Sequence, residues 1–556
     1  MERFDLKIIS GLEKCFGDQK ITDKKQISEL SMLSNERLSF QLAYTAETAL
    51  YIRGRFKCDL VMESPIAEHI SVEVIEQVPV RLPVYKDQND DNYLRKEPGL
   101  YPDLLLPFAI DKKDNFMFVQ DELRAMLVTV LCRDGIEAGK YPVKFKAVYN
   151  GNTLAEAEIQ IEVVGKKTDD LSIFHTEWFY TDCLAQYYNV PVWSERHWEI
   201  IENYAKEAVN MGINTLLTPL FTPPLDTLVG GERLTTQLVD VTVENGKYSF
   251  GFERLGRWIE MCLRVGVKRF EMNHLFTQWG AEHAPKVMAT VDGEYKKIFG
   301  WETEAAGAEY TEFLHAFLDA LIPYLKEKGV DKKCFYHISD EPRAEHLENY
   351  KKARAVVSEK LKDYTIIDAL SNYEFYRDGV VDSPVPGSNH IVPFVENKVP
   401  NLWVYYCCSQ NVGVSNRFVS MPGARIRIIG AQIYKYDIKG FLHWGYNFWN
   451  CRYSVYPINP FVETCGEYFT PAGDCFLVYP AQDGTPYVSL HARQFEMALE
   501  DHKALTLAEK LIGREATLAI LEEGADKLTF MEYPMDESYL LGMRAKLNEA
   551  IKNASL

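Results

Sequence analysis

Two adjacent acidic residues, Asp340 and Glu341, follow a short apolar stretch and precede Pro342. Neighbouring carboxyl groups can divide acid–base work, because one can stay charged while the other carries a proton. The same pattern suits the start of a helix, where acids complement the helix dipole and proline fits the first turn. Taken alone, the pattern favours this helix-capping interpretation, so the surrounding elements must decide between the two.

Adjacent acids fit one type of glycoside hydrolysis better than the others. In an ordinary retaining glycosidase two carboxyls lie about 5–5.5 Å apart on opposite sides of the scissile bond, which sequence neighbours can hardly arrange. In substrate-assisted hydrolysis the nucleophile is the 2-acetamido oxygen of the substrate itself. One carboxylate then supports the acetamido nitrogen, while its neighbour protonates the leaving oxygen and later activates water.

From residue 174 onward, short apolar segments alternate with amphipathic helices, a pattern typical of a (β/α)₈ barrel. The clearest helix begins after Ser194 and carries Trp198, Ile201, Ala205 and Ala208 on one face. The eight expected strands are 174–179, 214–220, 268–275, 334–338, 365–370, 402–407, 440–444 and 475–479. Since active sites lie at the carboxyl ends of barrel strands, the fourth strand would deliver Asp340 and Glu341 to the site.

The chain of 556 residues is too long for one hydrophobic core, and its pattern predicts a multi-domain α/β protein. Residues 1–166 are expected to form an N-terminal β-sandwich, because apolar and polar residues alternate at 37–44, 143–149 and 155–163. The polar segment 165–170 marks a boundary. A (β/α)₈ catalytic barrel over 171–513 and a short C-terminal helical appendix over 514–556 would follow.

Composition and charge exclude several classes of partner. The net charge of −19 would repel nucleic acid and anionic membrane surfaces, and no stretch of 18 apolar residues could span a bilayer. The start of the chain lacks the pattern of a secretory signal, and the 11 cysteines are scattered without CxxC spacing. These features predict a cytoplasmic protein with reduced thiols. Nothing in the sequence indicates its oligomeric state.

Four segments in order carry a resemblance to a known group of proteins. They are FYHISDEP at 335–342, LWVYYC at 402–407, NRF at 416–418 and GFLHWGYNFW at 440–449. Together they resemble the group called domain of unknown function 4091, which is similar to glycoside hydrolase family 123. Enzymes of that family are retaining β-N-acetylgalactosaminidases that use the substrate-assisted route. The resemblance implies that Asp340 stabilises the acetamido group and that Glu341 is the acid/base.

Further candidates for substrate contact lie near expected strand ends. The resemblance places Tyr373 where such enzymes set a tyrosine hydroxyl against the acetamido carbonyl, although an ordinary loop tyrosine explains it equally well. Aromatic walls and hydrogen bonds to the sugar are expected from Trp178, His337, Trp403, Tyr406, Trp444 and Asn447, although core packing explains any tryptophan. No His-x-His pair or HExxH motif is present, so we expect neither a metal nor a cofactor.

The leading hypothesis is therefore a retaining glycoside hydrolase that removes β-linked N-acetylhexosamine, with N-acetylgalactosamine preferred, and whose partner is a carbohydrate substrate. One alternative is a glycosidase acting on a sugar without a 2-acetamido group. The other is a non-catalytic glycan-binding protein in which the acid pair only caps a helix. The intact Asp340-Glu341 pair argues against the second alternative, since a binding module has no use for an additional acid at a barrel mouth.

Overall fold

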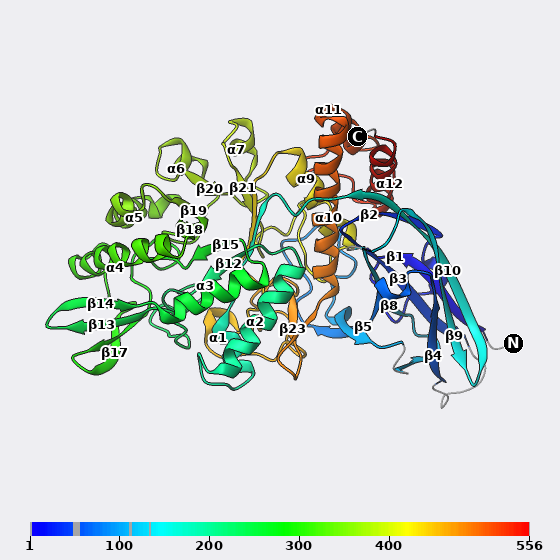
Figure 1. Ribbon diagram of the computed structural model, residues 1–556, viewed down its shortest axis with the longest axis horizontal. Helices are drawn as coiled ribbons and strands as arrows, with labels where there is room; N and C mark the ends of the chain where they lie inside the picture. The colour runs from blue at the N-terminus through cyan, green and yellow to red at the C-terminus, as the bar shows by residue number, and fades with distance from the viewer. Residues whose placement is uncertain (1–2, 48–55, 111–113, 133–134, 555–556) are drawn as a thin grey trace.

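A nearly closed sheet of eight parallel strands forms the centre of the molecule (Figure 1). The computed structural model describes residues 3–47, 56–110, 114–132 and 135–554. A bridge between Gly387 and Tyr405 brings the two edge strands of the sheet together. In spatial order the strands are β20 (Ser383–Val385), β19 (Thr365–Ala369), β18 (Cys334–Tyr336), β15 (Arg269–Met272), β12 (Thr215–Thr218), β11 (Phe174–Glu177), β22 (Gly440–His443) and β21 (Trp403–Tyr405).

Seven expected strands are confirmed, but the expected eighth strand at 475–479 is wrong. That segment leads into β23 (Val478–Pro480), which pairs antiparallel with β24 (Pro486–Val488) outside the barrel. The missing barrel strand is β20, which pairs parallel with β19. β20 has only three residues and contains a proline, so it has no alternating pattern, whereas 475–479 is apolar because it is buried in the core around the barrel.

Helices surround the barrel and alternate with its strands. Ser194 caps α2 as expected, since its hydroxyl accepts a hydrogen bond from the His197 N–H. Trp198 and Ile201 are buried on the inner face of the same helix. The helices are α1 (Thr181–Tyr187), α2 (Glu195–Asn210), α3 (Glu253–Val265), α4 (Ala308–Glu327), α5 (Leu347–Leu361), α6 (Tyr373–Arg377), α7 (Val392–Glu396), α8 (Gly423–Arg427), α9 (Ile429–Lys435) and α10 (Leu490–Ile512).

The N-terminal region is β-rich and contains two five-stranded sheets. The first has the order β1 (Arg3–Ser10), β3 (Glu36–Glu47), β8 (Arg124–Cys132), β5 (Ile70–Val80) and β6 (Gly99–Phe108). The second has the order β2 (Glu29–Ser34), β10 (Asn152–Lys167), β9 (Gly139–Tyr149), β4 (Phe56–Glu63) and β7 (Asn115–Phe118). One buried cluster contains residues of both sheets, among them Phe40 and Phe145.

The long segments after β12 and β15 hold a small sheet of their own, which lies at the left of Figure 1. It consists of β14 (Lys247–Gly251), β13 (Asp240–Glu244), β16 (Val287–Val291) and β17 (Glu294–Phe299). The segments after β12 and β15 therefore have regular structure that the sequence pattern did not indicate.

Short 3₁₀ turns complete the chain: η1 (Ile21–Asp23), η2 (Ala67–His69), η3 (Asp331–Lys333), η4 (Ala344–His346) and η5 (Arg452–Ser454).

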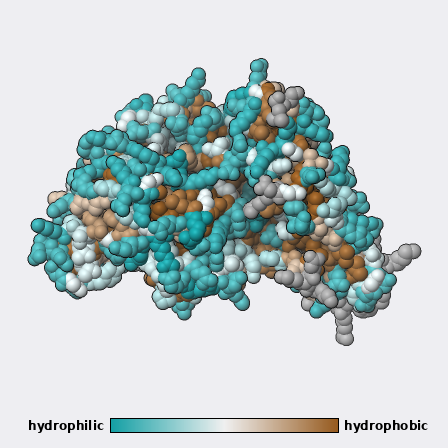
Figure 2. Space-filling model, in the orientation of Figure 1, coloured by the Kyte–Doolittle hydropathy of each residue, from teal (hydrophilic) through white to brown (hydrophobic). Residues whose placement is uncertain are grey.

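Helix α10 lies between the barrel and the N-terminal sheets, and α12 (Glu537–Asn553) packs against it after α11 (Arg514–Glu522). The partly buried ion pair of Arg425 with Asp90 also joins the barrel to the N-terminal region. Ten of the 11 cysteines are buried, and Cys408 is partly exposed. Within the described ranges, no helix has the length and apolar character needed to cross a membrane. The face in Figure 2 is mostly hydrophilic, with hydrophobic side chains gathered near its middle and at its β-rich end.

Candidate active site

Asp340 and Glu341 lie just beyond the carboxyl end of β18. The Glu341 N–H donates to the carbonyl of Ala369 at 3.0 Å, and the Trp279 N–H donates to the carbonyl of Asp340 at 2.9 Å. Neither acid caps a helix, because the first residues after the pair are not helical until η4 begins at Ala344. Glu341 has a φ of 43°, a left-handed conformation that is costly for a residue with a side chain and that clusters at functional sites.

The two carboxyls affect each other's charge. The pKa of Asp340 is well above its usual range, chiefly because its surroundings are poor in water and then because of the negative charge of Glu341. The hydroxyl of Tyr405 donates a hydrogen bond of 2.6 Å to Oε1 of Glu341. The raised pKa means that Asp340 keeps its proton to a higher pH than an ordinary aspartic acid does.

A third carboxyl, that of Asp226, belongs to the same site. It lies in the segment after β12, has a φ of 47°, and its carbonyl accepts a hydrogen bond of 2.8 Å from the Ser454 hydroxyl. Burial and the negative charge of Glu341 raise the pKa of Asp226 to about 7, although the positive charge of Arg233 opposes them. Sequence reasoning missed Asp226; the only signal was its place in a segment too long for a simple turn.

His337 and Trp178 meet below the acid pair, inside the barrel. Nε2 of His337 lies 2.6 Å from Oε1 of Glu271, and its Nδ1 lies 3.2 Å from Oδ1 of Asp368. Burial alone would lower the pKa of His337, but the bonds to the two carboxylates raise it to about 9. The indole of Trp178 donates 2.8 Å to the same oxygen of Glu271. A charged His337 lies close enough to Asp340 to favour its anion.

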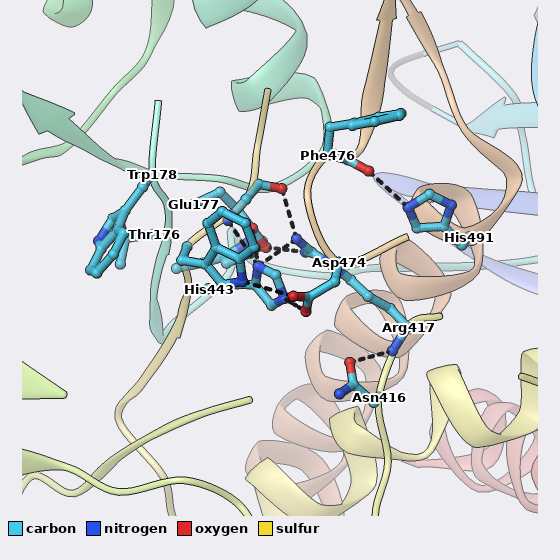
Figure 3. Close-up of polar contacts among 12 residues, drawn as sticks. Thr176, Glu177, Trp178, Asn416, Arg417, His443, Asp474, Phe476 and His491 are labelled. Carbon is cyan, nitrogen blue, oxygen red and sulfur yellow. Dashed lines mark hydrogen bonds and ion pairs between the residues drawn. The ribbon is translucent and has the colours of Figure 1, made fainter. Parts of the chain in front are cut away.

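Trp444 belongs to a second buried polar network. Its indole donates 3.0 Å to Oδ2 of Asp474, and Nε2 of His443 lies 3.3 Å from the other oxygen of that carboxylate. Arg417 joins His443 to Glu177, which ends β11, and Figure 3 shows these side chains converging from separate segments. Burial raises the pKa of Asp474 to about 7 against the opposing charge of Arg417. This network fixes the orientation of the Trp444 indole.

The other four predicted substrate-binding residues make contacts of their own. Trp403 lies at the start of β21, stacked on Phe174 with ring centroids 5.5 Å apart. Tyr373 packs edge-on against Phe394. Tyr406 packs against Phe441, and both hydrogen bonds of the Asn447 amide go to the backbone of Tyr180. Across the described residues, no hydrogen bond joins any of these four side chains to Asp340 or Glu341.

Tyr405 is the tyrosine of β21 that reaches the acid pair, and sequence reasoning missed it. Side chains alternate between the two faces of a strand, so Tyr405 and its neighbour Tyr406 must point in opposite directions. The hydroxyl of Tyr405 points to Glu341, whereas the ring of Tyr406 faces the helices, where it packs against Phe495. The alternation was a usable signal, but the sequence alone did not show which tyrosine faces the axis.

Comparison with known proteins identifies the family. The profile described as "Glycoside hydrolase 123, catalytic domain" matches residues 178–508. The chain belongs to glycoside hydrolase family 123. It is therefore a glycoside hydrolase, and the resemblance stated from its four sequence segments is confirmed.

One solved structure of the same family shares the fold. A family 123 glycoside hydrolase from Clostridium perfringens, whose report concerns glycolipid glycan hydrolysis, has a TM-score of 0.73 at 13% identity, covering 99% of this chain and 98% of that one. A family 39 glycoside hydrolase from Bacteroides cellulosilyticus WH2 has a TM-score of only 0.32 at 11% identity, with 88% and 82% covered. No curated protein matches this sequence. At such low identity the likeness to the Clostridium enzyme extends to the fold alone.

Proposed function

We propose that this family 123 enzyme is a retaining β-N-acetylhexosaminidase that prefers terminal N-acetylgalactosamine and uses Asp340 and Glu341 for substrate-assisted hydrolysis. One observation carries the proposal: two adjacent carboxyls at a barrel strand end, in which burial and the charge of Glu341 raise the pKa of Asp340. Two neighbours on one strand end cannot lie on opposite faces of a sugar, but they can serve its acetamido group and its leaving oxygen.

In the first step the acetamido oxygen attacks the anomeric carbon while the bond to the leaving oxygen breaks. Glu341 gives its proton to that oxygen. Asp340 accepts a hydrogen bond from the acetamido N–H while the acetamido group closes into an oxazolinium ring. In the second step Glu341 takes a proton from water, and the water oxygen attacks the anomeric carbon and opens the ring. Two inversions at this carbon give overall retention.

The raised pKa of Asp340 supports this division of labour. In the free enzyme the raised pKa of Asp340 favours a proton on that residue, while Oε1 of Glu341 accepts the hydrogen bond from Tyr405. An acetamido N–H that donates to Asp340 favours its anion instead, as does the charged His337 below it. Binding of the acetamido group would therefore favour loss of the Asp340 proton, which gives the anion that supports the oxazolinium ion.

A panel of aryl glycosides tests the proposal. We expect hydrolysis of aryl β-N-acetylgalactosaminides and none of aryl β-galactosides, because the second series lacks the internal nucleophile. A thiazoline analogue of N-acetylgalactosamine, which resembles the oxazolinium ion, should inhibit competitively. Equal hydrolysis of both series, or an active enzyme that the thiazoline does not inhibit, would contradict the mechanism. An enzyme inactive on every glycoside would favour the glycan-binding alternative.

Replacing Tyr405 tests the contact with Glu341. We expect Tyr405→Phe to lower kcat/KM about 10-fold to 100-fold, because a hydrogen bond to a charged group contributes about 1.5–3 kcal/mol. Tyr406→Phe is the matched control, since within the described part of the chain its buried hydroxyl has no hydrogen-bond partner. That control should change kcat/KM less than about 2-fold. Equal effects of the two substitutions would show that Tyr405 acts only through packing.

The domain division is also our proposal. The buried cluster shared by the two N-terminal sheets supports a β-sandwich over residues 1–166, followed by a barrel over 171–513 and a helical region over 514–556. The proposed chemistry requires only the side chains of the barrel and no metal or cofactor.

A further inference from the structure

Two aromatic side chains stand at the mouth of the barrel, outside the buried network. Trp279 follows β15 and its indole is 37% exposed, which is unusual for the largest apolar side chain. Tyr453 lies in η5, after β22, and its ring meets the indole edge to face with centroids 6.2 Å apart. The guanidinium of Arg452 covers the Tyr453 ring at 4.7 Å and donates 3.0 Å to its hydroxyl. The tyrosine ring is therefore held in place.

The backbone beneath this pair is held in a costly conformation. Trp279, Tyr453 and Ser454 have φ values of 56°, 61° and 54°, all in the left-handed region. Non-glycine residues adopt that region rarely, and they keep it where the surrounding structure over-determines it, which is common at ligand sites. Here it directs both rings to the same part of the barrel mouth.

Hydrogen bonds connect the pair directly to the carboxyl cluster. The Trp279 N–H donates to the carbonyl of Asp340 at 2.9 Å, and the Ser454 hydroxyl donates to the carbonyl of Asp226 at 2.8 Å. The Gln278 amide donates to the carbonyl of Thr227 at 3.2 Å. The segments after β12, β15, β18 and β22 thus meet at this pair, which borders the acid pair without belonging to it.

Depth in the barrel indicates which part of a substrate the pair would meet. Trp178 is only 2% exposed and lies inside the barrel beside His337, below Asp340, which the sugar that is cleaved off must reach. The rest of a glycan has to leave through the open mouth. With the terminal sugar at Asp340, Trp279 and Tyr453 at the mouth would meet the leaving-group side of the substrate.

We propose that Trp279 and Tyr453 form a stacking platform for the sugar to which the terminal N-acetylgalactosamine is attached, so that the enzyme's substrate is an oligosaccharide. The inference rests on the proposed function. The apolar C–H face of a neutral hexose matches a tryptophan ring, and the second ring and Arg452 supply a polar edge for its hydroxyls. A glycoside with a small aglycone would leave the platform unused.

The test separates the two parts of the substrate. We expect Trp279→Ala to lower kcat/KM for a β-N-acetylgalactosaminyl-galactose disaccharide about 10-fold to 100-fold, with a smaller loss for Tyr453→Ala. Trp279→Phe should recover part of the activity, because it keeps a ring. The Ki of the N-acetylgalactosamine thiazoline, which fills only the terminal-sugar site, should change less than about 2-fold in all three variants. Tyr295→Ala, on the distant strand β17 with its side chain 63% exposed, is the matched control and should change neither value.

Each other outcome overturns the platform. If Trp279→Ala weakens thiazoline binding as much as disaccharide turnover, the indole belongs to the terminal-sugar site. If the variant leaves the free disaccharide unaffected but slows cleavage of the same glycan on a lipid, the pair binds lipid instead of sugar. Unchanged disaccharide kinetics in a variant of an active enzyme refute the platform alone. A wild-type enzyme that neither binds the thiazoline nor cleaves the disaccharide refutes the proposed function and the platform with it.

Discussion

Asp340→Asn is expected to lower kcat/KM about 10²–10³-fold, and by the same factor for aryl glycosides with good and poor leaving groups. The substitution keeps the shape of the side chain but removes the charge that supports the developing oxazolinium ion. A preorganised electrostatic contribution of this kind is worth about 2.7–4 kcal/mol in comparable sites. The measurement is kcat/KM over a series of aryl β-N-acetylgalactosaminides that differ only in the pKa of the phenol.

Glu341→Gln should behave differently across the same series. It removes the proton donor, so substrates with poor leaving groups lose most activity, while activated aryl glycosides keep appreciable turnover. The acid limb of the pH profile should also move to lower pH. The charge of Glu341 helps to raise the pKa of Asp340, so without it Asp340 loses its proton, and becomes able to support the acetamido group, at lower pH.

Glu345→Gln is the matched control for these variants, because Glu345 is an exposed acid only a few residues further along the chain. It should leave both the rate and the pH profile unchanged. A conventional enzyme with Asp340 as nucleophile would instead form a glycosyl ester on that residue with a slow 2-fluoro sugar. Detection of this ester by mass spectrometry would exclude the substrate-assisted mechanism.

Local patterns in the sequence were sufficient to predict most of the barrel. Helix α2 was recognisable because its cap and its apolar face both lie within one short segment, 194–212. Strand β20 was not recognisable, since three residues carry no periodicity and its identity depends on pairing with β19. The apolar segment at 475–479 was misassigned for a related reason. A run of apolar residues indicates that a segment is buried, but a buried segment need not be a strand of the barrel sheet.

The acid pair was visible because its members are sequence neighbours at a strand end. The groups that shift the pKa values of these acids could not be recognised from the sequence. Glu271 and Asp368 bind His337 from two other strands, and Asp226 approaches from the segment after β12. Such contacts join residues that are distant in the sequence, and no local sequence pattern predicts them. The strand ends predicted the neighbourhood of Trp178 and Trp444, but a strand end does not show whether a ring faces a ligand or a buried carboxylate.

The stability of the protein should be sensitive to the loss of a single partner from the buried network of Figure 3. Arg417 donates 2.7 Å to Glu177 and 2.6 Å to Nδ1 of His443, and the side chains of Arg417 and Glu177 are completely buried. Burial, together with the charge of Arg417, holds the pKa of His443 well below its usual range, so this histidine is neutral. Its Nδ1 also accepts the N–H of Gly445, which leaves the ring proton on Nε2, facing Asp474.

Arg417→Met is therefore expected to lower the free energy of unfolding by about 3–5 kcal/mol, because removing one partner leaves the other charge buried and uncompensated. The midpoint of urea unfolding measures the loss. The exposed ion pair of Arg264 with Glu202 provides the matched control, and Arg264→Met should cost less than about 1 kcal/mol. The double variant Glu177→Gln with Arg417→Met removes both charges, so it should be more stable than Arg417→Met alone. A double variant that is no more stable would show that Arg417 acts through packing and its other hydrogen bonds instead of through the charge of Glu177.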